Sequence, residues 1–272
     1  MIQEVTREKI KGYLEAFIQK MINEHKKKSN LKATDLRPTL DHSTKGEIKP
    51  FHEALIPHGI MLMSEFERTF STTLGSTFEE AAKLIALDYH GRAERGKRLS
   101  GEVTTKSIDE IERIKNAINK SGMKRSYLDL VDEIVSSSKS GKTEPRLVIS
   151  DLYVHDNKGK EIYFEIKSPK PNKGQCLEVT ERLLHIHAIR RVNQRSVRTY
   201  FAMAYNPYGN SKSEYKHSFS MKYLDLENEV VIGREFWDLI GGPGTYEEVL
   251  SIYREVGKEK GPDMLDQLAL SY

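Results

Sequence analysis

The N-terminal half of the chain carries apolar residues at helical spacing. Over residues 1–28 they recur close to every 3.6 positions, which predicts a long helix. Further helices are predicted over 59–70, 108–119 and 127–135. Another is predicted to begin at an N-cap, either Ser76 or Thr77. Residues 31–58 contain three prolines and predict irregular structure, while the polar, basic stretch 91–106 predicts a mobile loop.

From residue 146 the pattern becomes that of strands. Residues 146–154 are rich in β-branched side chains, 155–160 have turn composition, and 161–167 form a second strand-like run, so this region predicts an antiparallel hairpin. The elements expected after it are a helix over 177–191, strands over 198–205 and 229–232, and helices over 236–240 and 246–256. This order predicts an α/β core with helical material packed at its N-terminal side.

Composition excludes several classes of protein. The 272 residues, 38% of them hydrophobic, suffice for a buried core and exclude a disordered chain, a collagen and a disulfide scaffold. The single cysteine, Cys176, can form neither an internal disulfide nor a cysteine-rich zinc site. No apolar run approaches the roughly 18 residues of a membrane span, and the N-terminus lacks the apolar core of a signal peptide. We therefore expect a soluble, cytoplasmic protein.

The net charge of +3 hides a strong segregation of charge along the chain. Residues 224–272 carry 11 acidic and 4 basic side chains, whereas residues 165–198 carry 8 basic and 3 acidic ones. Segregated positive charge suits a polyanion such as nucleic acid. The alternative is an ordinary solvated face with acidic neighbours.

Three charged residues of the predicted hairpin carry the candidate chemistry. Glu165 and Lys167 lie two positions apart on one strand, so their side chains point to the same face. A turn centred on Lys158 places Asp151 directly opposite Glu165. Directly paired residues share a face with Cβ atoms about 5 Å apart. The sequence therefore predicts that Asp151, Glu165 and Lys167 meet at the end of the hairpin.

Two carboxylates this close form an oxygen-rich site suited to Mg²⁺. Without a cation they repel, and one of them is driven toward protonation. An adjacent lysine can orient a water molecule, help to deprotonate it and stabilise charge on a phosphate, which suits metal-assisted attack of water on phosphorus. The alternative is an exposed hairpin with a cross-strand salt bridge worth about 0.5 kcal/mol.

Two features favour the site over the salt bridge. The strand ends abruptly in Ser-Pro-Lys-Pro-Asn directly after Lys167, which places the lysine at a strand end. A basic helix with Arg182, Arg190 and Arg191 follows.

The segments Ile-Ser-Asp-Leu-Tyr (149–153) and Phe-Glu-Ile-Lys-Ser-Pro-Lys-Pro-Asn (164–172) resemble the PD-(D/E)xK nuclease superfamily. Ser150 replaces the usual proline, which shapes the backbone and binds no metal, so we expect activity to be retained. More narrowly, both segments look like the TdeIII family of type II restriction endonucleases. Similar stretches lie at 50–55, 66–71, 74–79 and 233–237, so the resemblance spans about residues 50–240.

This resemblance implies a restriction-endonuclease-like core, with a mixed central β-sheet flanked by helices and a helical N-terminal region. It implies one nuclease domain over 1–272. Within it, 1–145 would be mainly helical and include the first core helix, 146–240 would form the catalytic α/β core, and 241–272 would form a C-terminal helical segment.

The implied activity is Mg²⁺-dependent cleavage of double-stranded DNA that leaves 5′-phosphates, at a short palindrome of the GGNCC type. A palindromic target implies a two-fold homodimer. The resemblance also implies a cognate DNA methyltransferase that protects the host DNA, as a functional partner and not a physical one.

The resemblance assigns roles to individual residues. Asp151 and Glu165 match the metal ligands, and Lys167 matches the catalytic lysine. Many superfamily members add a glutamate from the first core helix, for which Glu79 is the candidate and Glu80 the alternative. An ordinary acidic N-terminal turn, favoured by the helix dipole, would explain Glu79 equally well.

Basic residues after the hairpin are candidates for phosphate contacts or guanine recognition. These candidates are Lys170, Lys173, Arg190, Arg191, Arg195 and Arg198. The leading hypothesis is therefore a type II restriction endonuclease. The alternatives are a repair or junction nuclease of the same fold and a DNA-binding regulator that does not cleave.

Overall fold

The computed structural model describes residues 1–33, 58–139 and 141–269. The predicted irregular stretch 31–58, and with it the segment 50–55 of the resemblance, lies almost entirely outside the described residues. Contacts divide the chain into two units. The sheet unit comprises Met1–Thr6 and Phe78–Val249, and the helical unit comprises Arg7–Thr77 and Leu250–Tyr272. The expectation of one domain over the whole chain stays a prediction.

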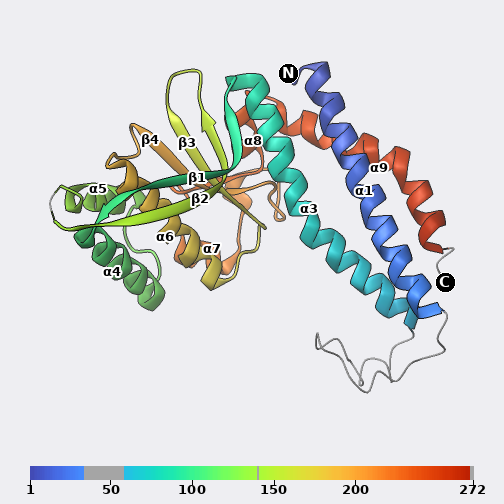
Figure 1. Cartoon of the computed structure of the whole chain (residues 1–272), viewed down its shortest axis with the longest axis horizontal. Helices are drawn as coiled ribbons and strands as arrows, with labels where there is room; N and C mark the ends of the chain where they lie inside the picture. Colours follow the sequence, from blue (N-terminus) through green and yellow to red (C-terminus); the bar gives the residue numbers. More distant parts are fainter. Residues whose placement is uncertain (34–57, 140, 270–272) are drawn as a thin grey trace. The chain divides into compact units, whose positions relative to one another are not determined.

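The sheet unit is built on a mixed five-stranded sheet (Figure 1). Its strands are β1 (Ala93–Thr104), β2 (Thr143–His155), β3 (Glu161–Lys167), β4 (Val197–Met203) and β5 (Val230–Ile232), and they lie side by side in that order. Strand β2 runs antiparallel to both of its neighbours, β1 and β3, and β3, β4 and β5 are parallel. The predicted α/β class and the mixed sheet are confirmed.

The register of the β2–β3 hairpin follows the predicted centre at Lys158. His155 pairs with Glu161, and the ladder continues to Leu152 opposite Phe164. Asp156 closes the turn, because its Oδ1 accepts from the backbone N–H groups of Lys158 and Lys160. The ladder ends at Leu152 and Phe164, one position short of Asp151 and Glu165, so their direct pairing stays a prediction.

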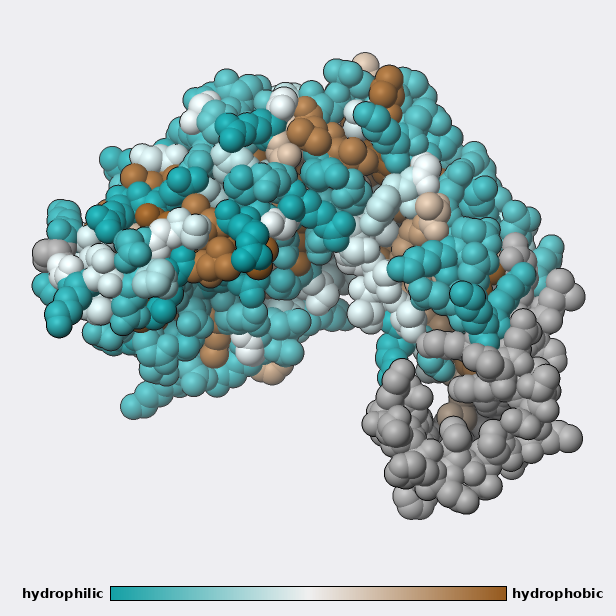
Figure 2. All heavy atoms as spheres, in the orientation of Figure 1, coloured by the Kyte–Doolittle hydropathy of each residue, from teal (hydrophilic) through white to brown (hydrophobic). Residues whose placement is uncertain are grey.

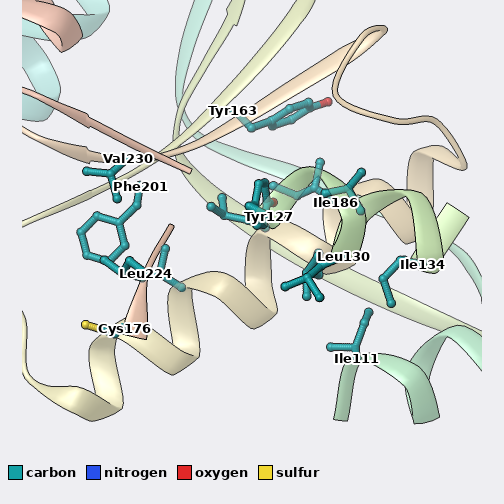
Figure 3. Packing of buried hydrophobic residues seen from close by; sticks show 14 of the residues in the cluster. Ile111, Tyr127, Leu130, Ile134, Tyr163, Cys176, Ile186, Phe201, Leu224 and Val230 are labelled. Carbon is teal, nitrogen blue, oxygen red and sulfur yellow. The ribbon is translucent and has the colours of Figure 1, made fainter. Parts of the chain in front are cut away.

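Helices α4 (Thr105–Ser121), α5 (Tyr127–Ser137) and α6 (Lys173–Arg190) cover one face of the sheet (Figure 1). Their apolar sides meet strand residues in one buried cluster, of which Figure 3 shows Ile111 and Ile134 from the helices and Tyr163 and Phe201 from the strands. Asn172 caps α6 in a reciprocal capping box with Gln175. The rigid start of α6 fixes the helix next to the end of β3.

The other face of the sheet packs against α8 (Arg234–Gly241). Phe164 makes an edge contact with Phe236 and stacks on Tyr200. The Trp237 indole donates to the carbonyl of Ala204 at 2.7 Å. With helices on both faces, β3 is a buried central strand.

The helical unit contains α1 (Glu4–Ala33) from Arg7 onward, the part of α3 (His58–His90) up to Thr77, and α9 (Thr245–Ala269) from Leu250. Phe17 packs against Phe70 with ring centroids 5.1 Å apart, and Lys11 pairs with Glu255 at 2.5 Å. The predicted helix over 1–28 is confirmed and is slightly longer.

Two predicted elements were wrong. Ser76 and Thr77 do not cap a helix, because α3 runs unbroken through them and their hydroxyls donate back to the carbonyls of Thr73 and Leu74. Glu79 therefore lies in the middle of a helix and not in its opening turn.

The predicted mobile loop 91–106 is strand β1, which pairs with β2 from Ala93 to Thr104. As an edge strand it keeps mostly polar side chains; its burial alternates from Ala93 to Glu102, but only Leu99, Val103 and Thr104 are buried. The structure also contains a short 3₁₀ helix η1 (Lys212–Glu214) and a helix α7 (Ser218–Tyr223) that the pattern did not predict.

The surface view shows a mainly hydrophilic face with separate apolar patches (Figure 2). No helix in the described part of the chain combines the length and the apolar character that a membrane span needs.

Candidate active site

The β2–β3 ladder opens at its end, and polar side chains take the place of the missing backbone bonds. Asp151 Oδ2 accepts from the backbone N–H of Ile166 at 2.8 Å. The hydroxyl of the neighbouring Ser150 donates to the carbonyls of Phe164 and Leu152 at 3.0 and 3.1 Å. Ser150 therefore ties the strands together where a proline could not, and Asp151 is held by a backbone donor.

The three predicted residues meet at this opening. The Lys167 ammonium lies 3.0 Å from Asp151 Oδ2 and 3.4 Å from Glu165 Oε2. Glu165 is fully buried, whereas Asp151 and Lys167 remain partly open to solvent. The structure thus brings together the aspartate, the glutamate and the lysine that the sequence singled out.

A second cation completes the cluster. Arg182, from α6, donates to Glu165 Oε2 at 2.6 Å and to Glu178 Oε1 at 2.6 Å. The sequence placed Arg182 on a basic helix without giving it a role. The sequence gives no local signal for this pairing, because Arg182 is half-buried on α6 and Glu165 lies 17 positions before it.

Burial and the nearby charge of Asp151 raise the pKa of Glu165 to about 7, against the opposing pull of Lys167 and Arg182. Burial acts to lower the pKa of Lys167, but the charges of Asp151 and Glu165 outweigh it and raise that pKa above its usual value. Lys167 is therefore an ammonium at neutral pH. It can donate to a phosphate oxygen and orient water, and in this state it cannot act as a base.

The donor set fits a divalent cation. Glu165 Oε1 is buried and, within the described residues, has no hydrogen-bond partner. Such an orphaned oxygen costs free energy unless a ligand satisfies it. In the described ranges no group of three or more His, Cys, Asp or Glu side chains forms a metal site. Two carboxylates suit Mg²⁺, which commonly takes one or two protein carboxylates and keeps waters or phosphate oxygens as its other ligands.

The proposed helix glutamate has other partners. Glu79 Oε2 accepts from Arg95 Nε at 2.7 Å, and Glu80 pairs with Lys83 and lies 3.7 Å from Arg95. Arg95 sits on β1 opposite Leu152. No ion pair or hydrogen bond in the described structure joins either glutamate to Asp151, Glu165 or Lys167, so their catalytic role stays a prediction.

The six candidate DNA-contacting residues differ in their contacts within the chain. Arg190 is occupied, because it donates to Glu161 and to the Tyr163 hydroxyl, and Arg191 donates to the carbonyl of Glu102. Lys170 and Lys173 lie over the rings of Tyr208 and Tyr223. Arg195 is exposed and Arg198 is partly buried. None of these contacts tests DNA binding.

Comparison with known proteins supplies the family. Residues 2–257 match the family described as type II restriction endonuclease, HinfI. The chain is 44% identical to the type II restriction enzyme HgiEI and 43% identical to HgiBI, both from Herpetosiphon aurantiacus, over 98% of each chain. It is 23% identical to the type II restriction enzyme MjaII of Methanocaldococcus jannaschii over 76% of this chain and 58% of that protein. The chain therefore belongs to the HinfI family of type II restriction endonucleases, which are site-specific deoxyribonucleases.

Proposed function

We propose that this enzyme cleaves double-stranded DNA in a Mg²⁺-dependent reaction at Asp151, Glu165 and Lys167, leaving 5′-phosphates. The observation that carries the proposal is the buried, unpartnered Oε1 of Glu165 beside Asp151 and an ammonium. Asp151 and Glu165 would hold the ion. When bound, Mg²⁺ supplies charge neutralisation and polarisation for attack of water on the phosphate.

The chain's own residues position the reaction. Lys167 would donate from its ammonium to a phosphate oxygen and stabilise the charge that develops there. Arg182 holds one oxygen of Glu165, and the other oxygen, which has no partner in the described residues, would bind the ion. The backbone N–H of Ile166 and the Lys167 ammonium both donate to Asp151 Oδ2 and fix it in place. A site of this kind is preorganised by the end of the hairpin and by α6.

The proposal also includes the superfamily, the target sequence and the oligomeric state of the enzyme. The motif Ser-Asp followed by Glu-Ile-Lys supports a place in the PD-(D/E)xK superfamily, and the segments that resemble the TdeIII family support a GGNCC-type palindrome as the target. A palindrome is most simply cut by a two-fold homodimer. We place the enzyme in the cytoplasm with a cognate methyltransferase. Glu79, or Glu80 in its place, remains the proposed additional acidic residue.

Digestion of DNA of known sequence tests this function. Plasmid DNA incubated with the protein and Mg²⁺ should give discrete fragments, and sequencing of the ends should place every cut at one palindrome with a 5′-phosphate. Omission of Mg²⁺ should leave the plasmid supercoiled. Nicks that depend on DNA structure would favour a repair or junction nuclease, and intact plasmid in Mg²⁺ would favour a DNA-binding regulator.

A further inference from the structure

An aromatic and basic surface next to the active site is not used by the chemistry described above. We call it the α7 strip and define it by Lys170, Lys173, Tyr208, Phe219 and Lys222. Its rings form a chain of contacts from Tyr208 through Tyr215, His217 and Phe219 to Tyr223, with neighbouring centroids 5.6–6.4 Å apart. Tyr215 and Tyr223 are buried and form the floor of the strip.

The upper side chains of the strip are open to solvent. Tyr208 is 39% exposed and Phe219 is 41% exposed. Large apolar side chains on one exposed surface commonly mark a binding site. The α7 strip therefore exposes apolar side chains above the buried rings of Tyr215 and Tyr223.

Lysines surround these apolar side chains. Lys170 lies 5.6 Å from the Tyr208 ring centroid, and Lys173 and Lys222 lie 5.3 and 5.4 Å from that of Tyr223. The segments 168–175 and 205–223 contain five lysines, of which Lys212 pairs with Glu235 of α8 at 3.0 Å, and one carboxylate, Glu214. Glu214 is committed to its own turn, where it accepts from the N–H groups of Asn210 and Ser211. The strip therefore presents positive charge with little local compensation.

The strip is continuous with the catalytic strand. The Tyr215 hydroxyl donates to the carbonyl of Pro169 at 2.7 Å, two residues after Lys167. Lys173 is the first residue of α6, the helix that carries Arg182. A duplex whose phosphate lies at Asp151 and Glu165 would continue past this strand end.

The positive charge of the strip favours DNA over a second copy of the chain as its binding partner. In a two-fold dimer that buried this patch against itself, lysines would face lysines. A DNA duplex offers phosphates to the lysines and base edges, including the thymine methyl group, to exposed apolar side chains.

We propose that the α7 strip is a DNA-contacting surface that flanks the cleaved phosphate, with Lys170 and Lys222 on backbone phosphates and Phe219 against bases. The inference rests on the proposed function, because that function supplies the duplex at the neighbouring site. Phe219 is thereby a specificity-determining residue, and α7 is the element that presents it.

Binding measurements in Ca²⁺ in place of Mg²⁺, which keep the DNA intact, test the strip. Each phosphate contact contributes about 0.9 to the slope of log affinity against log salt. The double variant Lys170→Ala/Lys222→Ala should lower that slope by about 1.8, whereas Lys158→Ala, in the hairpin turn, should leave it unchanged. An unchanged slope in the double variant would overturn the proposal.

Variants of the apolar residues test base contact. Phe219→Ala should bind the cleaved sequence about tenfold more weakly, and unrelated duplexes within twofold of the wild type. Leu128→Ala, on α5 and also 41% exposed, is the matched control and should bind normally. Tyr208→Ala is a second variant on the strip and should also weaken binding of the cleaved sequence. Wild-type affinity in both variants would refute the proposal.

Two further results separate the possible failures. Unchanged DNA binding with an altered oligomeric state in Phe219→Ala would assign the strip to contact between copies of the chain and refute DNA contact. A wild-type protein that does not cut DNA would refute the proposed function, while the salt slopes would still decide whether the strip binds DNA.

Discussion

Glu165 and Glu229 are both fully buried in the sheet unit, and both have a raised pKa, yet their surroundings differ. Glu229 precedes β5 and accepts from neutral donors on both oxygens: the Thr180 hydroxyl at 2.5 Å and the backbone N–H of Asp225 at 3.1 Å. Glu165 is held by two cations on one oxygen, and its other oxygen has no partner in the described structure.

The difference separates a structural carboxyl from the one that we propose as a metal ligand. Burial raises the pKa of Glu229 to about 8, so it is mostly protonated at neutral pH and stabilises the fold as a hydrogen-bonding group. Burial and the charge of Asp151 also raise the pKa of Glu165, but Lys167 and Arg182 oppose this rise and hold the value at about 7, so a substantial share of Glu165 is ionised at neutral pH. An ionised carboxylate with an open oxygen can bind a cation, and a protonated, fully bonded one cannot.

Among the variants proposed here, the loss of Asp151, the acidic neighbour of Glu165, should reduce cleavage the most. In Asp151→Asn the amide oxygen can still accept from Ile166 N–H, so the fold should remain, but the site loses one of its two anionic ligands. Cleavage in Mg²⁺ should fall below detection, as measured by loss of supercoiled plasmid. Circular dichroism and the thermal midpoint provide the folding control. Wild-type cleavage would remove Asp151 from the site.

Lys167→Ala should reduce cleavage at least about a hundredfold, because preorganised charge at the phosphate is lost. Specific binding of the target duplex in Ca²⁺ should be largely retained. Lys158→Ala, in the turn of the same hairpin, is the control and should cleave normally. Retained turnover in Lys167→Ala would exclude this ammonium from the mechanism.

Arg182→Met should slow cleavage about ten- to hundredfold, because the variant loses a hydrogen bond from a charged group to Glu165. Removal of this cation raises the pKa of Glu165 further, so the acidic limb of the pH–rate profile should move to higher pH. Arg182→Lys should partly restore both the rate and the profile. A slower enzyme with an unmoved profile would show that Arg182 does not act through Glu165.

Glu229 should affect stability and not catalysis. Because its folded pKa of about 8 lies above the unfolded value of 4.5, its contribution is present at low pH and is lost as pH rises through 8. The free energy of unfolding of the wild type should therefore fall relative to Glu229→Gln between pH 5 and pH 8, by at most roughly 1.4 kcal/mol per pH unit. Urea unfolding of both proteins at several pH values measures this, and parallel curves would contradict it.

The hairpin and its charged triad could be predicted because the turn composition sets the register and the register sets which side chains meet. Strand β1 could not be recognised, because its inward positions are mostly polar residues and the sequence therefore shows no alternation of apolar with polar residues, although burial alternates along the strand. The helix start before Glu79 was wrongly predicted. Ser and Thr are common N-cap residues, but inside a helix their hydroxyls can instead donate to a carbonyl of the preceding turn, as those of Ser76 and Thr77 do.

The roles of Arg182 and Glu229 depend on tertiary contacts. Arg182 reaches Glu165 over 17 positions, and Glu229 reaches Thr180 over 49. Periodicity reports only which side of an element is apolar, so neither pairing leaves a local signal in the sequence. The two glutamates could therefore be distinguished only in the folded structure.

The most direct test of the account is side-by-side digestion of plasmid DNA in Mg²⁺ by Glu165→Gln and Glu229→Gln. The account predicts that Glu165→Gln leaves the plasmid supercoiled while Glu229→Gln cuts it as the wild type does. Cleavage at the wild-type rate by Glu165→Gln would contradict it.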